Sequence, residues 1–310
     1  MPSFYLNEHQ HKGIEYVIAL LQAGYWRTHR RMSADMIFFD HDVGTHGVGW
    51  RTGLEQAYEA GKPTFIYPHS ARPNVMMDTH PSWPHTRALF TIGEGHKAVL
   101  EALKYTCPIE VTGWAYSDIH DFKPSQPEGE TKVLFAPIHP NRNGFLDDLD
   151  KACNARALEI LMDTPNIDIT VRHIKNLELN GLWYEDSVHY VEGKTDGSTK
   201  EIEEADVIIG SYTIAYITVA IGKPLIMMAE HMRPHSGNML GMVRYSPNWE
   251  SYSEIMRYPF EIENCTDGSD FLEMADMVMA GQRSVENWKD RFIGKPFDPQ
   301  YFVSRVEAYL

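Results

Sequence analysis

The sequence predicts an α/β protein with parallel sheets in two units. Short apolar runs such as ADMIFF (34–39), PTFIYP (63–68) and ALFTIG (88–93) alternate with amphipathic stretches of helical spacing. Strands that alternate with helical stretches of this kind indicate βαβ units and a parallel sheet. The segment DFKPSQPEGE at 121–130 interrupts the alternation and has the composition of a linker. The alternation then resumes, which predicts a second α/β unit.

An internal similarity supports two halves of one design. EQAYEAGKPTFIYPH at 55–69 and ITVAIGKPLIMMAEH at 217–231 both read as a helix, Gly-Lys-Pro, a strand and a loop with a histidine. A glycine after a helix accepts the left-handed conformation, and proline prevents the helix from continuing. The matching flanks therefore predict the same helix-to-strand turn in each half.

Composition limits the classes of function. The 310 residues include 43 acidic and 28 basic ones, a formal net charge of −15, which disfavours nucleic acid as a partner. Three separated cysteines, Cys107, Cys153 and Cys265, show no C-x-x-C spacing and suit reduced thiols. The apolar stretch at 14–23 contains Glu15 and is too short to span a membrane. We therefore expect a soluble, cytoplasmic protein without a membrane span.

Residues 203–228, EEADVIIGSYTIAYITVAIGKPLIMM, contain the strongest local signal. A strand ends at Gly210 and an apolar helix follows at once. In an open α/β sheet such a helix presents backbone N–H groups and the positive end of its dipole to the ligand crevice. Small residues at Gly210, Ser211 and Thr213 would let a phosphate group approach. The alternative is that Ser211 or Thr213 only caps the helix.

This stretch resembles the region that CDP-glycerol glycerophosphotransferases and related two-domain glycosyltransferases write as A-D-x-x-I-T-D-Y-S-S, a short helix, G-K-P and a strand. Aligned from Gly222, Tyr212 and Thr213 fall on the two serines. Further short motifs resemble the family in the expected order, so that the resemblance covers most of the chain. They are FIYPHSARPNV (65–75), VTGWAYSDI (111–119), VLFAPIHPN (133–141), ITVRHI (169–174) and the tail RFIGKPFDPQYFVSRVEAYL (291–310).

The resemblance implies the GT-B arrangement, two Rossmann-like domains whose parallel sheets face each other across a cleft. The implied domains are an acceptor-side domain at 1–124, a donor-binding domain at 125–285, and a C-terminal helix at 286–310 that packs back on the first domain. The implied activity is a metal-independent transfer, without a cofactor, of a sugar or polyol phosphate from a nucleotide-diphosphate donor to an acceptor hydroxyl.

Three alternatives stay open at this point. UDP-GlcNAc 2-epimerases share the GT-B layout, so the protein is alternatively a UDP-sugar 2-epimerase. A catalytically silent nucleotide-sugar-binding protein is the second alternative, because Ile217 stands where these families usually carry an acid. Glu261 or Glu263 could replace that acid. A transferase acting on modified DNA is disfavoured by the acidic composition and the lack of a basic stripe.

The candidate catalytic residues follow predicted strands of the first domain. His69 falls on the histidine that the family is thought to use as a base. His11, in the first loop, has a side chain with an ordinary pKa near ~6.5 and could also accept the proton of the acceptor hydroxyl. Asp42 would orient a histidine or bind an acceptor hydroxyl. On the acceptor side, His9 shares the first loop and Arg72 could bind an anionic group.

The candidate donor-binding residues follow strands of the second domain. Arg142 suits the charge of a diphosphate because its guanidinium binds phosphate oxygens in a fork. The resemblance places His173 on a family histidine at a strand end. The full donor-binding set is His139, Arg142, His173, Gly210, Ser211, Tyr212 and Thr213.

The triplet Asp40-His41-Asp42 has the composition of a possible metal site. This triplet resembles the D-x-D that binds a divalent cation in the other major glycosyltransferase architecture. The glycines at 44, 47 and 49 do not fit G-x-G-x-x-G, so a dinucleotide fingerprint is not supported. We expect the triplet to belong to the acceptor side and to bind no metal.

Overall fold

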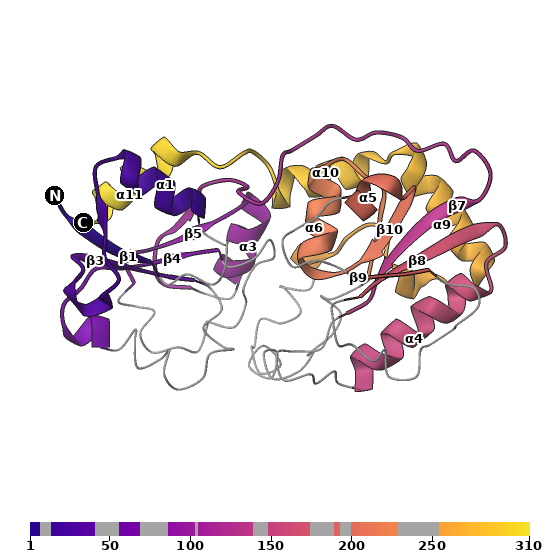
Figure 1. Ribbon diagram of the computed structural model, residues 1–310, viewed down its shortest axis with the longest axis horizontal. Coiled ribbons are helices and arrows are strands. Elements are labelled where there is room, and N and C mark those ends of the chain that lie inside the picture. The colour runs from indigo at the N-terminus through magenta and orange to yellow at the C-terminus, as the bar shows by residue number, and fades with distance from the viewer. Residues whose placement is uncertain are drawn as a thin grey trace. The chain divides into compact units, whose positions relative to one another are not determined.

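The structure, a computed structural model, describes residues 1–6, 14–40, 56–68, 86–102, 105–138, 148–173, 189–192, 200–228 and 254–310. Contacts group these residues into two compact units, which Figure 1 shows as two α/β bodies. Within the described ranges, the first unit contains residues 1–116, 254–256 and 290–310, and the second contains 117–228 and 257–289. Within the described ranges the chain thus passes between units after residues 116, 256 and 289, whereas the boundaries expected from the sequence lie near 124 and 285.

The first unit contains a six-stranded parallel sheet in the order β2-β1-β3-β4-β5-β6. Its strands are β1 (Ser3–Leu6), β2 (Trp26–Arg27), β3 (Met36–Asp40), β4 (Thr64–Tyr67), β5 (Ala88–Thr91) and β6 (Ile109–Val111). Its helices are α1 (Ile14–Gln22), α3 (Glu94–Ala102) and α11 (Pro299–Tyr309), with a 3-10 turn, η1 (Arg31–Ser33). Because β2 and β3 flank β1 on opposite sides, the strand order reverses between β1 and β3.

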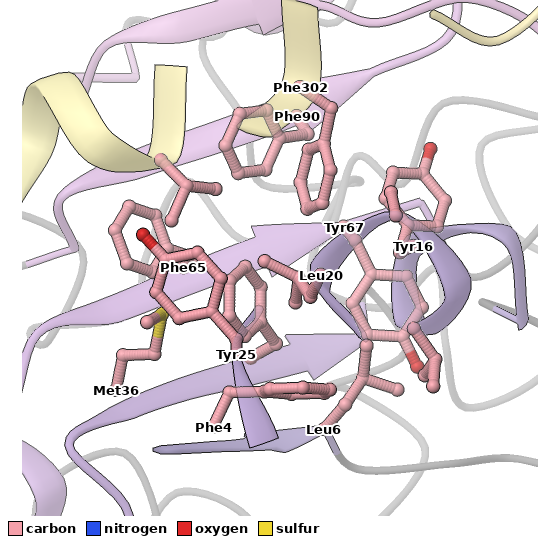
Figure 2. Packing of buried hydrophobic residues seen from close by; sticks show 14 of the residues in the cluster. Phe4, Leu6, Tyr16, Leu20, Tyr25, Met36, Phe65, Tyr67, Phe90 and Phe302 are labelled. Atoms are coloured by element: carbon pink, nitrogen blue, oxygen red, sulfur yellow. The ribbon is translucent and has the colours of Figure 1, made fainter. Parts of the chain in front are cut away.

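The C-terminal helix completes the core of this unit. Figure 2 shows Phe302 of α11 beside Phe90 of β5, with Tyr16 and Leu20 of α1 in the same cluster. The ring of Phe302 lies 4.8 Å from that of Phe90 and 5.0 Å from that of Tyr16. Alternate residues of a strand point to one face of its sheet, so α1 and α11 together cover one apolar face.

A polar cluster at the edge strand β6 also holds α11. The carboxylate of Glu110 accepts hydrogen bonds from the Tyr301 hydroxyl at 2.7 Å, the Tyr309 hydroxyl at 2.5 Å, and two nitrogens of Arg305 at 2.9 and 2.7 Å. Burial raises the pKa of Glu110, but the three donors outweigh it and leave the pKa lowered. The helix is therefore attached to the sheet by packing and by a charged hydrogen-bond cluster.

The second unit contains a five-stranded parallel sheet in the order β11-β10-β7-β8-β9. Its strands are β7 (Thr131–Ala136), β8 (Ile167–His173), β9 (His189–Glu192), β10 (Val207–Gly210) and β11 (Leu225–Met227). Its helices are α4 (Asp148–Met162), α5 (Lys200–Glu204), α6 (Tyr212–Ala220) and α9 (Gly268–Ala280), with a 3-10 turn, η6 (Ile262–Asn264); α10 (Arg283–Phe292) runs across the boundary between the units. All four residues of β10 are buried, as expected of a central parallel strand.

The two Gly-Lys-Pro segments at 61–63 and 222–224 close their helices in the same way. In each, the glycine N–H donates to the carbonyl three residues earlier, and the lysine N–H donates to the carbonyl five residues earlier. This is a Schellman motif, with Gly61 at φ 64° and Gly222 at φ 75°. The proline carbonyl then accepts a hydrogen bond of 3.0 Å from the neighbouring strand in both units. The internal similarity of the sequence therefore reflects a repeated turn.

Residues 120–125, which we call the strap, are bound along the second unit. The N–H groups of His120 and Lys123 donate to carbonyls at the end of α6, at 2.8 and 3.0 Å. The hydroxyl of Ser125 donates to the carboxylate of Asp206 at 2.7 Å. The first half of the stretch with linker composition is therefore fixed to this unit rather than free.

Candidate functional site

The strand order of the second unit defines a candidate ligand site. β8 and β9 lie on one side of β7, while β10 and β11 lie on the other, so the order reverses between β7 and β10. These two strands end together, because Ala136 and Gly210 are register partners. Open α/β sheets bind ligands outside the carboxyl ends of their strands at such a reversal. The segments 136–138 and 210–213 therefore form the described part of the candidate site.

Helix α6 begins directly at this reversal. Ser211 occupies the N-cap position with φ −132° and ψ 178°, but its side chain makes no capping hydrogen bond. Capping by this serine, the alternative from the sequence, is therefore not what the structure shows. The first turn of α6 contains no acidic residue, whereas α4 begins with Asp148 and carries Asp150. Of the two helices that follow β7 and β10, α6 is the one whose positive dipole end suits an anion.

Gly210 is required by packing. A Cβ at this position would lie 2.6 Å from the side chain of Ile214 in α6. The absence of a side chain thus lets α6 lie close against the sheet, and the approach of a phosphate group to Gly210 stays a prediction. Ile217 is also buried, and the sequence of α6 contains no charged residue. The position at which the families that the sequence resembles carry an acid is thus part of the core in this chain.

A side chain on α4 holds the main chain where β7 ends. The Oδ1 atom of Asn154 accepts a hydrogen bond of 2.8 Å from the N–H of Ile138, and its Nδ2 atom donates one of 3.0 Å to the carbonyl of the same residue. Asn154 is 1% exposed. Asn154 is not among the site residues predicted from the sequence. The signal that could have found it is a polar residue at a helix position that is expected to be buried, which is uncommon.

The structure places the predicted donor-binding residues as follows. Gly210, Ser211, Tyr212 and Thr213 lie together at the start of α6, and Thr213 is partly exposed. The backbone of His173 ends β8, beside β7, in register with Glu192 of β9. His139 and Arg142 follow Ile138 in the sequence but lie outside the described residues. Their predicted roles stay predictions.

Three adjacent strand ends of the first unit precede the predicted catalytic residues. Leu6 ends β1, and its register partner Phe38 lies two residues before the end of β3 at Asp40, which pairs with Tyr67 of β4. The hydroxyl of Tyr116 donates to the carbonyl of Pro68, just after β4, at 3.0 Å. The candidates that follow these ends lie outside the described residues and stay predictions; they are His9, His11, Asp42, His69 and Arg72.

Glu261 is a buried acid near the end of β11. It forms an isolated parallel bridge with Met227, which is itself the register partner of Gly210. Burial and, to a smaller degree, the charge of Glu263 raise its pKa to about 7. Glu261 is 3% exposed, whereas Glu263 is exposed. Whether either replaces the acid that is missing at Ile217 stays a prediction.

The described ranges bear on metal binding and on membrane insertion. In these parts of the chain, no group of three or more His, Cys, Asp or Glu side chains is placed to hold a metal ion. None of the helices found there combines the length and the apolarity that crossing a bilayer requires. The Asp40-His41-Asp42 loop lies largely outside these ranges, so metal independence stays a prediction.

Solved structures similar to this chain match it along nearly its whole length. A protein assigned as a UDP-N-acetylglucosamine 2-epimerase from Listeria monocytogenes matches with a TM-score of 0.58 at 10% identity, over 99% of this chain and 95% of its own. The glycosyltransferase SnogD from Streptomyces nogalater matches with a TM-score of 0.57 at 9% identity, over 99% of both chains. A UGT transferase from Siraitia grosvenorii in complex with UDP matches with a TM-score of 0.53 at 8% identity, again over 99% of both.

No family model matches the sequence, and a comparison with curated proteins gives no match. At identities this low, the structural similarity carries information on the fold. Each unit has a parallel sheet with a reversal of strand order, and the similarity runs through both units. The prediction of an α/β protein with the GT-B fold, two Rossmann-like units, is thereby confirmed.

Proposed function

We propose that the protein is a transferase that moves a sugar, or a polyol phosphate, from a nucleotide-diphosphate donor to an acceptor hydroxyl. One observation carries the proposal: the start of α6, without a cap from Ser211 and without an acid, lies at the strand reversal of the second unit. Two of the similar structures, a glycosyltransferase and a transferase in complex with UDP, support the same activity.

The chemistry follows from the charge that develops on the leaving nucleotide diphosphate. Backbone N–H groups in the first turn of α6 would donate to phosphate oxygens, and the helix dipole would stabilise their charge. Arg142 would bind the diphosphate as a fork, and His139 and His173 would add donors. No metal ion or cofactor is part of this proposal.

The acceptor hydroxyl needs a base and a binding site. His69 would take its proton, and His11 and Asp42 are the further candidates for this step. On the acceptor side, Arg72 and His9 would bind an anionic or polar group. Closure over the bound donor would exclude water, which otherwise competes with the acceptor. The free thiols of the three cysteines support a cytoplasmic location.

A UDP-sugar 2-epimerase is the second candidate, because the structure from Listeria monocytogenes is similar over nearly the whole chain. Incubation with UDP-GlcNAc separates the candidates. An epimerase converts the sugar while it remains bound to UDP, whereas a transferase releases UDP by slow hydrolysis when no acceptor is present. A silent binding protein does neither.

The proposed function is tested by a negative charge at the start of α6. We expect Thr213→Asp to weaken binding of the preferred nucleoside diphosphate by at least about tenfold, since the carboxylate repels the diphosphate. The same variant without ligand should be slightly more stable, by about 0.5 kcal/mol, because an acid favours a helix N-terminus. Titration calorimetry with UDP, CDP, GDP and ADP, together with thermal unfolding, measures both effects.

Thr213→Asn is the matched control, because asparagine has the shape of aspartate without its charge. It should bind the diphosphate nearly as well as the wild type. If the wild type binds none of the four diphosphates, or if Thr213→Asp binds as tightly as Thr213→Asn, the proposed function is wrong. A binding wild type is stabilised by about 2.7 kcal/mol at 100 times the dissociation constant, which a thermal shift detects.

A further inference from the structure

The main chain that follows β7 is held by a side chain of α4. This feature is separate from the N-terminus of α6. The strand ladder between β7 and β10 ends at the pair Ala136 and Gly210. Two residues later, the carboxamide of Asn154 binds both the N–H and the carbonyl of Ile138. A neighbouring strand offers the main chain the same pair of groups. The side chain thus continues the ladder past the point at which the sheet stops.

Several properties make this contact more than an ordinary surface bond. Asn154 is 1% exposed and Ile138 is 2% exposed, so water does not replace these hydrogen bonds when they break. The carboxamide is planar and binds both the N–H and the carbonyl of one residue, which fixes the orientation of that stretch of main chain. Asn154 comes from the middle of α4, a helix of 15 residues, which provides a rigid base.

The position of Ile138 gives the contact a consequence for ligand binding. It lies just beyond the carboxyl end of β7, on one side of the strand reversal, while the start of α6 lies on the other. A diphosphate bound by the first turn of α6 would lie next to the chain that leaves β7. The N–H of Ile138 is already used by Asn154 and is not available to a phosphate oxygen. The role of Asn154 is therefore to hold the main chain at Ile138, which borders the site.

We propose that Asn154 is a positioning residue for nucleoside diphosphates, which holds the exit of β7 in the geometry that the bound diphosphate requires. This inference rests on the proposed function. Asn154 does not touch the ligand in this proposal; it acts through the main chain of Ile138. Displacement of a binding element by a fraction of a bond length is enough to weaken a preorganised site.

The test compares two variants that each remove a buried side-chain hydrogen bond. Asn154→Ala frees Ile138, whereas Thr164→Val removes the bond of 2.7 Å from the Thr164 hydroxyl to the carbonyl of Ile160 in the last turn of α4, ahead of the amino end of β8. Valine has the shape of threonine, so the control leaves packing unchanged. Both variants should lower the melting temperature by a few degrees. Only Asn154→Ala should raise the dissociation constant of the nucleoside diphosphate, by about tenfold or more.

Amide hydrogen exchange provides a readout without ligand. In Asn154→Ala the amide of Ile138 should exchange at least about tenfold faster than in the wild type, while Thr164→Val leaves it unchanged. Exchange that stays slow in Asn154→Ala overturns the inference, and so does a dissociation constant equal to that of Thr164→Val. Both results leave the proposed function intact when the wild type binds. A wild type that binds no nucleoside diphosphate overturns the proposed function, and the ligand-binding part of the inference with it.

Discussion

Replacing Gly222 by alanine is expected to lower the free energy of unfolding by about 3 kcal/mol or more. Gly222 has φ 75°, a conformation that costs a residue with a side chain about 1 to 2 kcal/mol. A Cβ would also lie 2.1 Å from the carbonyl oxygen of Asp121 in the strap. The backbone of the strap would have to move away, which breaks the hydrogen bonds of His120 and Lys123 to the end of α6. Chemical denaturation of the two proteins measures the difference.

Gly61 is the matched control within the same molecule. It occupies the same position of the same turn at φ 64°, but a Cβ there would meet no atom within 4 Å. Gly61→Ala should therefore cost only the conformational strain, about 1 to 2 kcal/mol. Equal losses for the two variants would show that the strap does not lie against Gly222. A larger loss at Gly222 assigns the excess to the contact with the strap.

Replacing Glu261 by glutamine is expected to stabilise the protein at pH 8 by about 1 to 2 kcal/mol. The pKa of Glu261 is raised from 4.5 to about 7, first by burial and then by the charge of Glu263, against smaller opposing effects of a backbone hydrogen bond at Tyr258 and of Arg257. Above pH 7 the folded protein therefore holds a buried carboxylate that the unfolded chain would hydrate. Glutamine keeps the shape of the protonated acid and removes this cost.

The pH dependence of the free energy of unfolding follows from the direction in which the pKa of Glu261 is shifted. Between pH 4.5 and about 7 the folded protein binds a proton at Glu261 that the unfolded chain does not bind. The stability of the wild type should therefore fall as the pH rises through this range and level off above it. Denaturation at pH 5, 6, 7 and 8 should show this fall in the wild type and a flatter curve for Glu261→Gln. Glu263→Gln, at an exposed position, is the control and should keep most of the slope.

Much of the fold was predictable because its signals are local. The fully apolar run at 207–209 predicted a buried strand. Gly-Lys-Pro predicted the end of α6, because a glycine in the left-handed conformation and a nearby proline end a helix within a few residues. The predicted donor-binding residues from Gly210 to Thr213 lie at a carboxyl strand end for the same reason. In a βαβ unit, the residue that follows a strand lies at the carboxyl end of the sheet, which is where such sheets bind ligands.

The remainder depends on contacts between residues far apart in the chain. Nothing near Asn154 in the sequence shows that its side chain meets Ile138, 16 residues earlier. The cluster around Glu110 includes Tyr309, which is 199 residues away. The composition of 121–130 predicted a linker, whereas the strap is bound to the second unit, and that binding depends on the surface that it meets. The pKa of Glu261 likewise depends on burial, which no local pattern sets.

The contribution of α11 to the core of the first unit has a consequence for the order in which the chain folds. Phe302 and Val306 are fully buried against strands that are synthesised near the N-terminus. Domains fold as their chain becomes available during synthesis. The apolar face of the first unit is therefore covered only after Phe302 and Val306 have been synthesised, while the described residues of the second unit all precede residue 290. Synthesis that stops before residue 302 would thus leave the core of the first unit open, although its strands are made before those of the second unit.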